Sequence, residues 1–168
     1  MVYRYYGSYR PEPVILTERV LSKTGGNRLE IAVEWKSGKE TRSWKQFVTD
    51  TQYNRDNDVV DRLVLSDNGK ETELPNKDNL DLFKLYEGAY LIPQHSPVLS
   101  GEVEQLVTVG RDKFPCRVRT YKTKVRNRHA VMTVTDSKEF KWTNVSRYYK
   151  TQQGGLIYAM EVVGYGNR

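Results

Sequence analysis

The chain has 168 residues, with 27 Lys and Arg against 21 Asp and Glu, and therefore a formal net charge of +6. One cysteine excludes an internal disulfide framework, so the fold must depend on its hydrophobic core. The length fits a single domain over residues 1–168. No window is apolar and long enough to span a bilayer, and the start lacks the apolar region of a signal peptide, so we expect no transmembrane segment.

The first part of the chain shows the two-residue period of β-strands. Residues 13–21 and 28–35 are separated by a turn-forming stretch that contains Gly-Gly-Asn. In the second of these segments the apolar residues from Leu29 to Trp35 alternate with charged ones. This pattern predicts a hairpin, and residues 40–48 have the composition of a third strand.

The next part combines a polar run with a second hairpin signal. Residues 50–58 predict a loop, and their carboxylates lack the glycine and glutamate positions of a calcium-binding loop, which favours an ordinary acidic loop. Strands are then expected at residues 59–65 and 70–74. Asn68 and Gly69 join them, and this pair is typical of a type I′ turn.

The only predicted helix covers residues 78–88, where apolar residues recur at helical spacing and Gly88 fits the C-terminal end. Its apolar residues occupy more than a single stripe, so we expect other structure to wrap around it. Residues 89–101 contain two prolines and His95, and they predict an extended connector between two β-rich halves.

The second half begins with the clearest strand pattern of the chain. Apolar and polar residues alternate over 102–110 and 114–121, on both sides of a Gly-Arg-Asp turn, and Cys116 falls in phase with buried neighbours. Further strands are expected at 130–135, 140–145 and 154–164. The predicted fold class is mainly β (α+β), with a curved antiparallel sheet or half-barrel of about nine strands wrapped around one short helix.

This second half also carries a pattern of spaced residues: Val107-Thr-Val109, Phe114-Pro-Cys116, Trp142, Gly154-Gly-Leu-Ile157 and Glu161. Over residues 102–164 it resembles exported bacterial β-rich envelope proteins and lipoproteins, and it is similar in outline to the lipoprotein-carrier superfamily. The resemblance implies a half-barrel of antiparallel strands. It implies a periplasmic or envelope-associated location if a signal peptide has been removed, and it implies no catalytic residues.

No cluster of residues predicts catalysis, a metal or a cofactor. His95 and His129 lack neighbours at metal-ligand spacing, and Cys116 has no second thiolate nearby. A nucleophilic pair of Cys116 with either histidine stays open, because catalytic partners meet in space. The phase of Cys116 with its apolar neighbours favours a core residue instead. We therefore expect a protein that is not an enzyme and has no cofactor.

The preferred functional hypothesis is a binding protein of the bacterial cell envelope. It would hold a lipid-like or other apolar ligand, or a hydrophobic segment of a partner such as another envelope protein, on the concave face of its sheet. The competing interpretation is that the same side chains fill a dry core. The candidate lining residues are Leu80, Leu82, Phe83, Leu85, Tyr86, Trp35, Trp44 and Trp142.

The alternative hypothesis follows from the charge distribution. Residues 1–50 carry +3, residues 51–110 carry −6 and residues 111–168 carry +9. The basic strand pair at 111–128 would bind an acidic protein, anionic lipid or nucleic acid. Nucleic acid is the least favoured of these partners, because the spacing of an RNA-recognition sheet is absent, although basic residues alternate with tyrosines near the start. The candidate residues of this anionic-partner patch are Arg117, Arg119, Lys122, Lys124, Arg126 and Arg128.

Overall fold

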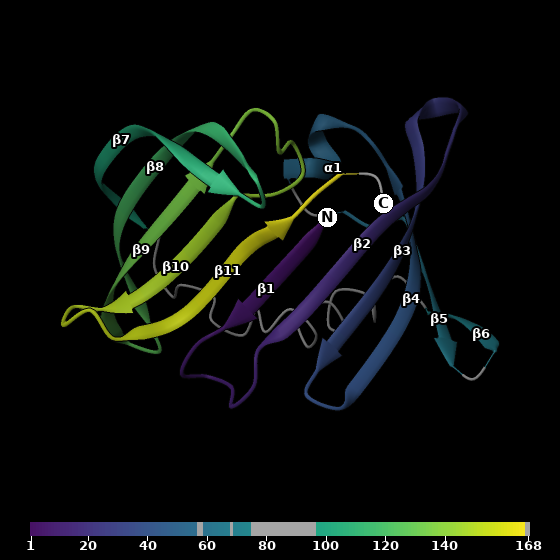
Figure 1. The fold of residues 1–168 in the computed structure, drawn as a ribbon, viewed down its shortest axis with the longest axis horizontal. Coiled ribbons are helices and arrows are strands. Elements are labelled where there is room, and N and C mark those ends of the chain that lie inside the picture. The colour runs from purple at the N-terminus through teal and green to yellow at the C-terminus, as the bar shows by residue number, and fades with distance from the viewer. Residues whose placement is uncertain (57–58, 68, 75–96, 167–168) are drawn as a thin grey trace. The chain divides into compact units, whose positions relative to one another are not determined.

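The structure is a computed structural model that describes residues 1–56, 59–67, 69–74 and 97–166. These residues form eleven strands, paired antiparallel, and two short helical segments (Figure 1). The prediction of a mainly β, antiparallel protein is therefore confirmed. The strands β1 (Val2–Tyr6) and β10 (Ser146–Thr151) were not expected, whereas the strand expected at 140–145 is absent.

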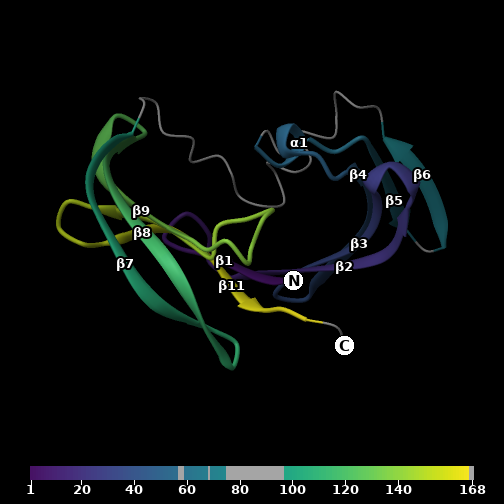
Figure 2. The same ribbon diagram turned by 90° about the horizontal axis from the view of Figure 1, so that it is seen from above.

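The chain divides into two compact units. We name residues 1–13 and 90–168 the terminal unit, because it holds both ends of the chain, and residues 14–89 the inserted unit. Within each unit the strands bend along their length, as β7, β8 and β9 show in one unit and β2 and β3 in the other (Figure 2). The expectation that the chain forms a single domain stays a prediction.

The inserted unit is a meander in which each strand pairs with the next along the chain. Its strands are β2 (Val14–Thr24), β3 (Arg28–Ser37), β4 (Glu40–Thr49), β5 (Arg62–Asp67) and β6 (Lys70–Leu74). The predicted hairpin of β2 and β3 is confirmed, and so are the strands expected near β4, β5 and β6. Gly26 and Asn27, with φ of 75° and 58°, let the chain reverse in the short 3-10 turn η1 (Gly25–Asn27).

The alternation in β3 and β4 places one set of side chains in the core of the inserted unit. Val33 pairs with Trp44 and lies on the same face as Trp35, because residues two apart on a strand share a face. Leu63 of β5 is fully buried on this face beside Gln46. These apolar side chains supply the hydrophobic burial that stabilises the meander.

The loop predicted at residues 50–58 contains a helical turn, α1 (Gln52–Asp56). Local polar contacts stabilise it. The Asn54 backbone N–H donates to Thr51 Oγ1 at 3.1 Å, and the Arg55 guanidinium pairs with the Asp50 carboxylate. The polar residues 50–58 thus connect two strands, as predicted. They also contain a helical turn, which Thr51 caps by accepting the hydrogen bond from Asn54.

In the terminal unit the strand order is β1, β11, β10, β9, β8, β7. The strands are β1 (Val2–Tyr6), β7 (Val98–Val109), β8 (Asp112–Val125), β9 (Arg128–Asp136), β10 (Ser146–Thr151) and β11 (Leu156–Gly164). Its first strand in sequence thus pairs with its last. Tyr3, Tyr5, Met132, Tyr149, Tyr158 and Met160 are buried and form much of the core of this unit.

The hairpin predicted from the alternation at 102–121 is confirmed as β7 and β8, and both strands are longer than expected. The predicted connector 89–101 is wrong at its end, because Val98–Gly101 belong to β7 and pair with β8. At the next turn Arg126 and Asn127 both have positive φ, 48° and 62°, as a type I′ turn requires. Asparagine tolerates this conformation, whereas arginine adopts it rarely.

The strand predicted at 140–145 is wrong. These residues lie in the connection between β9 and β10, and the strand that follows is β10. Phe140 is held by ring packing rather than by strand pairing. Its ring packs edge to face against those of Phe114 and Tyr165, with centroid distances of 5.1 and 5.8 Å. Phenylalanine favours strands, but Phe140 instead fixes the connection between β9 and β10 by its ring contacts.

The helix predicted at 78–88, with Leu80, Leu82, Phe83, Leu85 and Tyr86, lies outside the described residues. The same holds for His95. Within the described ranges, no helix has the length and apolar character needed to cross a bilayer.

Candidate functional site

The most unusual surface of the terminal unit is its edge strand β7. In the part of the chain that the structure describes, β7 pairs with β8 alone, so its other side is a free edge. Four large apolar side chains of this strand are more than half exposed: Val98 (65%), Leu99 (53%), Val103 (58%) and Leu106 (67%). A long edge strand with exposed apolar side chains is a ready template for another strand.

The exposed side chains of β7 lie on both faces of the sheet. Val98 and Val103 pair with Lys122 and Val118 of β8, whereas Leu99 and Leu106 pair with Tyr121 and Pro115. Directly paired residues point to the same side, so the two valines share one face and the two leucines the other. A strand added beside β7 would therefore find apolar neighbours on both of its faces.

The acidic residues of β7 are only loosely balanced. Glu102 and Glu104 approach the Arg117 guanidinium at 3.6 and 3.8 Å, and the Glu104 side chain is 81% exposed. Two carboxylates share one guanidinium, which leaves this stretch of the edge net negative. It would favour a basic side chain on an added strand.

The outer strand of the inserted unit, β6, is short and charged, unlike β7. β6 has five residues, and Lys70, Glu71 and Glu73 make it strongly charged. Short length and charge protect an edge strand from unwanted pairing. β7 has twelve residues and exposes valine and leucine beside its two glutamates, so it is less protected than β6.

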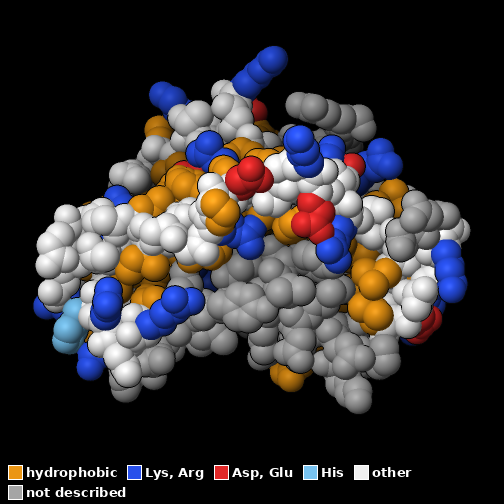
Figure 3. Space-filling view, turned by 90° about the horizontal axis from the view of Figure 1, so that it is seen from below, with side chains coloured by type: hydrophobic (Ala, Val, Ile, Leu, Met, Phe, Trp, Pro, Cys, Tyr) orange, Lys and Arg blue, Asp and Glu red, His pale blue; other side chains and the backbone are white. Residues whose placement is uncertain are grey.

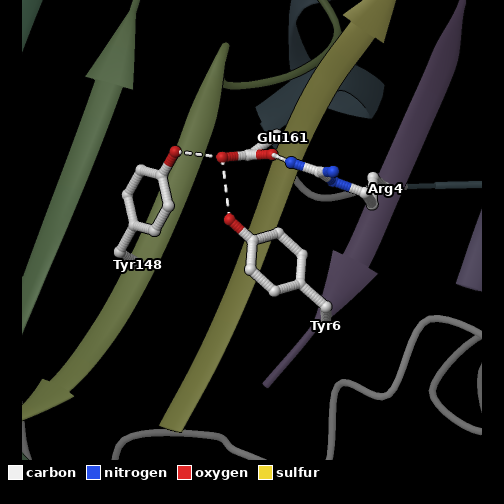
Figure 4. A network of polar contacts seen from close by, with 4 residues as sticks. All are labelled: Arg4, Tyr6, Tyr148 and Glu161. Carbon is white, nitrogen blue, oxygen red and sulfur yellow. Dashed lines mark hydrogen bonds and ion pairs between the residues drawn. The ribbon is translucent and has the colours of Figure 1, made fainter. Parts of the chain in front are cut away.

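A second arrangement joins three strands on one face of the terminal unit. Figure 4 shows the Glu161 carboxylate of β11 between Tyr148 of β10 and Tyr6 and Arg4 of β1. Glu161 Oε1 accepts hydrogen bonds from the Tyr148 and Tyr6 hydroxyls at 2.5 and 2.9 Å. Its Oε2 accepts from Arg4 Nη2 and Nε at 2.6 and 3.2 Å. Ala159, fully buried, lies between the two tyrosines in the strand register.

These contacts determine the protonation of the group. Burial alone would raise the pKa of Glu161, but hydrogen bonds from Tyr148, Arg4 and Tyr6 outweigh it and lower the pKa below its ordinary value. Burial, followed by the hydrogen bond to Glu161, raises the pKa of Tyr148 far above its ordinary value. The carboxylate is thus ionised with both oxygens occupied, and it acts as a clamp across the strands.

The predicted lining residues are only partly brought together. Trp35 and Trp44 lie on one face of the inserted unit and are 7% and 2% exposed, so they belong to its core. Trp142 lies in the connection between β9 and β10 of the terminal unit. The apolar ligand expected beside these tryptophans stays a prediction.

The structure also divides the predicted anionic-partner patch. Arg117 is engaged with Glu102 and Glu104, and Arg119 is paired with Asp136, so these two arginines are locally neutralised. Lys122 and Lys124 point to the opposite face of β8, because the strand alternates sides. Arg126 lies in the turn and Arg128 begins β9, and both are exposed.

The cysteine is confirmed as a core residue. Cys116 is 4% exposed, and burial raises the pKa of its thiol despite hydrogen bonds that involve Ser137 and Val107. His129 is exposed in the turn region of β9. In the described ranges no group of three His, Cys, Asp or Glu side chains is placed to hold a metal ion.

Sequence reasoning missed the clamp and the edge. Arg4 and Tyr6 were interpreted only as part of a basic and aromatic pattern near the start, because their carboxylate partner is 157 positions from Arg4 along the chain. The signal for β1 was present, since Tyr3 and Tyr5 alternate with Arg4 and Tyr6. That β7 would be an edge strand depends on sheet order, which alternation does not reveal.

No protein-family model matches this sequence, and no curated protein matches it in sequence. Among solved structures, the crystal structure of MucB is similar, with a TM-score of 0.49 and 11% sequence identity. The alignment covers 99% of this chain and 53% of that chain, so this chain spans about half the length of MucB. The similarity is distant and concerns the fold alone.

Proposed function

We propose that the protein is a non-enzymatic binding protein that takes up an extended, hydrophobic segment of a partner protein as an added strand along β7. The observation that carries this proposal is the exposure of Val98, Leu99, Val103 and Leu106 on a twelve-residue strand that has one partner strand, β8, among the described residues. In such binding, main-chain hydrogen bonds provide affinity and alternate side chains provide specificity.

The edge defines the chemistry of the partner segment. Apolar residues on both faces of β7 favour an added strand that is apolar on both faces, and Glu104 favours Lys or Arg opposite it. A second copy of β7 is a poorer partner. Antiparallel pairing centred near Val103 would gather Glu102 and Glu104 of both copies around the symmetry axis, with only one Arg117 from each copy to balance them.

An envelope location belongs to the same proposal. It is supported by the resemblance of residues 102–164 to exported β-rich envelope proteins, and a partner segment there would come from another envelope protein. Fractionation of the native host, with detection of the protein in periplasmic and membrane fractions, tests this location. Recovery in the cytoplasmic fraction alone would remove it.

Binding along β7 can be tested with peptides that stand in for the partner segment. Random twelve-residue peptides displayed on phage are selected on the purified protein, and one enriched peptide is titrated by calorimetry. We expect enriched sequences with apolar residues on both strand faces and at least one basic residue. Amide hydrogen exchange in β7 should slow when the peptide is added, because a new strand protects the free edge.

Matched variants decide whether the edge is the site. Val103→Lys with Leu106→Lys places charges on both faces of β7 and should weaken peptide binding at least tenfold, about 1.4 kcal/mol. Val20→Lys with Leu21→Lys is the control, since these residues of β2 are also exposed, at 56% and 43%. Equal binding by the β7 variant and the control, or enrichment of peptides without the expected pattern, contradicts the proposal.

A further inference from the structure

The terminal unit carries a second surface, which shares only Val98 with the proposed edge binding. Lys122 of β8 pairs with Val131 of β9, and Val131 pairs with Lys150 of β10. Lys124 pairs with His129 in the adjacent row. Because paired residues point to the same side, Lys122, Lys124 and Lys150 share one face, which we name the lysine face. Lys150 lies outside the patch that the sequence predicted.

The lysine face is unbalanced in charge. Among the described residues none of its three lysines forms an ion pair. The carboxylates of β7 and Asp136 lie on the opposite face, with Arg117 and Arg119. Glu161 is on the same face as the lysines, but Arg4 neutralises it. Strand alternation has therefore separated paired arginines from unpaired lysines.

Apolar side chains are interspersed with these charges. Val98, 65% exposed, pairs with Lys122, so the row across four strands reads Val98, Lys122, Val131 and Lys150. Neighbouring strands are about 4.8 Å apart, which spaces the two lysine backbones by about 10 Å. Figure 3 shows Lys and Arg side chains gathered around a histidine, with hydrophobic side chains beside them.

The aromatic residues of this face argue against nucleic acid. Single-stranded nucleic acid needs aromatic ring faces on which bases can stack. The Tyr148 ring has the Lys150 ammonium over it at 6.0 Å, and the Tyr6 ring has the Arg4 guanidinium at 4.8 Å. Their hydroxyls are committed to Glu161. The cations thus occupy the positions that bases would take.

We propose that the lysine face docks the protein on a membrane surface rich in anionic phospholipid. Lysine is a flexible point charge, suited to diffuse attraction toward many phosphates rather than to bidentate recognition of one group. The long side chains reach phosphates while Val98 and Val131 contact the boundary between headgroups and acyl chains. Arg126, exposed at the neighbouring turn, adds to the same field.

Vesicle sedimentation tests this docking. The protein is mixed with vesicles of phosphatidylcholine alone or with about 30% phosphatidylglycerol. Binding should require phosphatidylglycerol and fall steeply as salt rises from about 50 to 300 mM, since ions screen exposed charges. Each lysine contributes about fivefold, so the triple variant Lys122→Gln, Lys124→Gln, Lys150→Gln should bind about 100-fold more weakly.

The control removes the same charge elsewhere. Lys23→Gln, Lys39→Gln and Lys70→Gln change three exposed lysines of the inserted unit and should leave vesicle binding within about twofold. Unchanged circular dichroism and melting temperature verify that both triple variants fold. The proposal is overturned by equal losses in the two variants or by no binding to phosphatidylglycerol at low salt. Tighter binding of a single-stranded oligonucleotide than of the vesicles, lost in the first variant, also overturns it.

Discussion

The Tyr148 hydroxyl on β10 donates a 2.5 Å hydrogen bond to Oε1 of Glu161 on the neighbouring strand β11. Through its other oxygen the same carboxylate holds Arg4 of β1. One side chain, with 19% exposure, therefore connects three adjacent strands of the terminal unit. The stability of this unit should depend on it more than on any surface ion pair.

We expect Glu161→Gln to lower the free energy of unfolding by about 2 kcal/mol at pH 7, because three donor side chains lose a charged acceptor. The pKa of Glu161 is lowered in the fold, so its contribution is present above the unfolded pKa. It is lost as pH falls through the folded value. Urea unfolding between pH 7 and pH 3 should show the gap to wild type closing in acid.

Glu34→Gln is the control for this prediction. Glu34 forms an ion pair with Lys36 at 2.8 Å, but both side chains are about half exposed, at 46% and 52%. Such pairs contribute about 0–1 kcal/mol. A loss as large as that of Glu161→Gln would contradict the special role of the buried carboxylate.

We expect Tyr148→Phe to reduce the fall in stability at alkaline pH. Burial and the hydrogen bond to Glu161 raise the pKa of Tyr148, so its contribution is full below the unfolded pKa of about 10. That contribution declines as pH rises above this value. Unfolding free energies between pH 8 and pH 11 should therefore converge for wild type and variant.

Tyr53→Phe serves as the matched control, because Tyr53 is 70% exposed. It should leave the alkaline slope unchanged. Parallel slopes for wild type and Tyr148→Phe would show that Tyr148 ionises equally in the folded and unfolded chains.

Gly7→Ala should destabilise the protein by about 3 kcal/mol. Gly7 has φ of 144°, and a Cβ there would lie 2.3 Å from the backbone oxygen of Ile157. Neither the conformation nor the space suits a side chain. Gly25→Ala is the control, since a Cβ at Gly25 meets nothing within 4 Å. Thermal unfolding compares them, and equal melting temperatures would contradict the prediction.

Cys116 should resist a thiol reagent in the native protein and react fully after denaturation. The side chain is buried, and burial raises the pKa of the thiol, so little thiolate is present or accessible. Absorbance with an aromatic disulfide reagent, with and without urea, measures this. Rapid labelling of the native protein would reopen a reactive role for Cys116.

The strands that alternation predicted were those with clear apolar and charged partners. The alternation from Leu29 to Trp35 locates β3 and its buried residues Val33 and Trp35. The alternation from Val103 to Val109 locates β7 but not its burial, because only Val109 of that strand is buried. β10 was missed because Tyr148 and Tyr149 are adjacent residues of the same type, so the sequence shows no alternation between the two faces of the strand. Tyr149 is buried, whereas Tyr148 is held by Glu161 on the other face.

The candidate sites were harder to predict, because they depend on long-range pairing. Lys122 and Lys150 lie in one row of the sheet because both pair with Val131. Arg117 lies on the same strand as Lys122 but on the opposite face. The sequence shows the basic segment 111–128. It does not show which of these charges meet carboxylates, since sheet order and register decide that.

The pairing of β1 with β11 constrains when the terminal unit can be completed during synthesis. Val2 pairs with Gly164, so β1 cannot complete its pairing with β11 until residue 164 has been synthesised. The strands of the inserted unit pair with their sequence neighbours and face no such delay. Nascent β1 therefore waits longer for β11 than the strands of the inserted unit wait for one another, which gives a chaperone time to bind it.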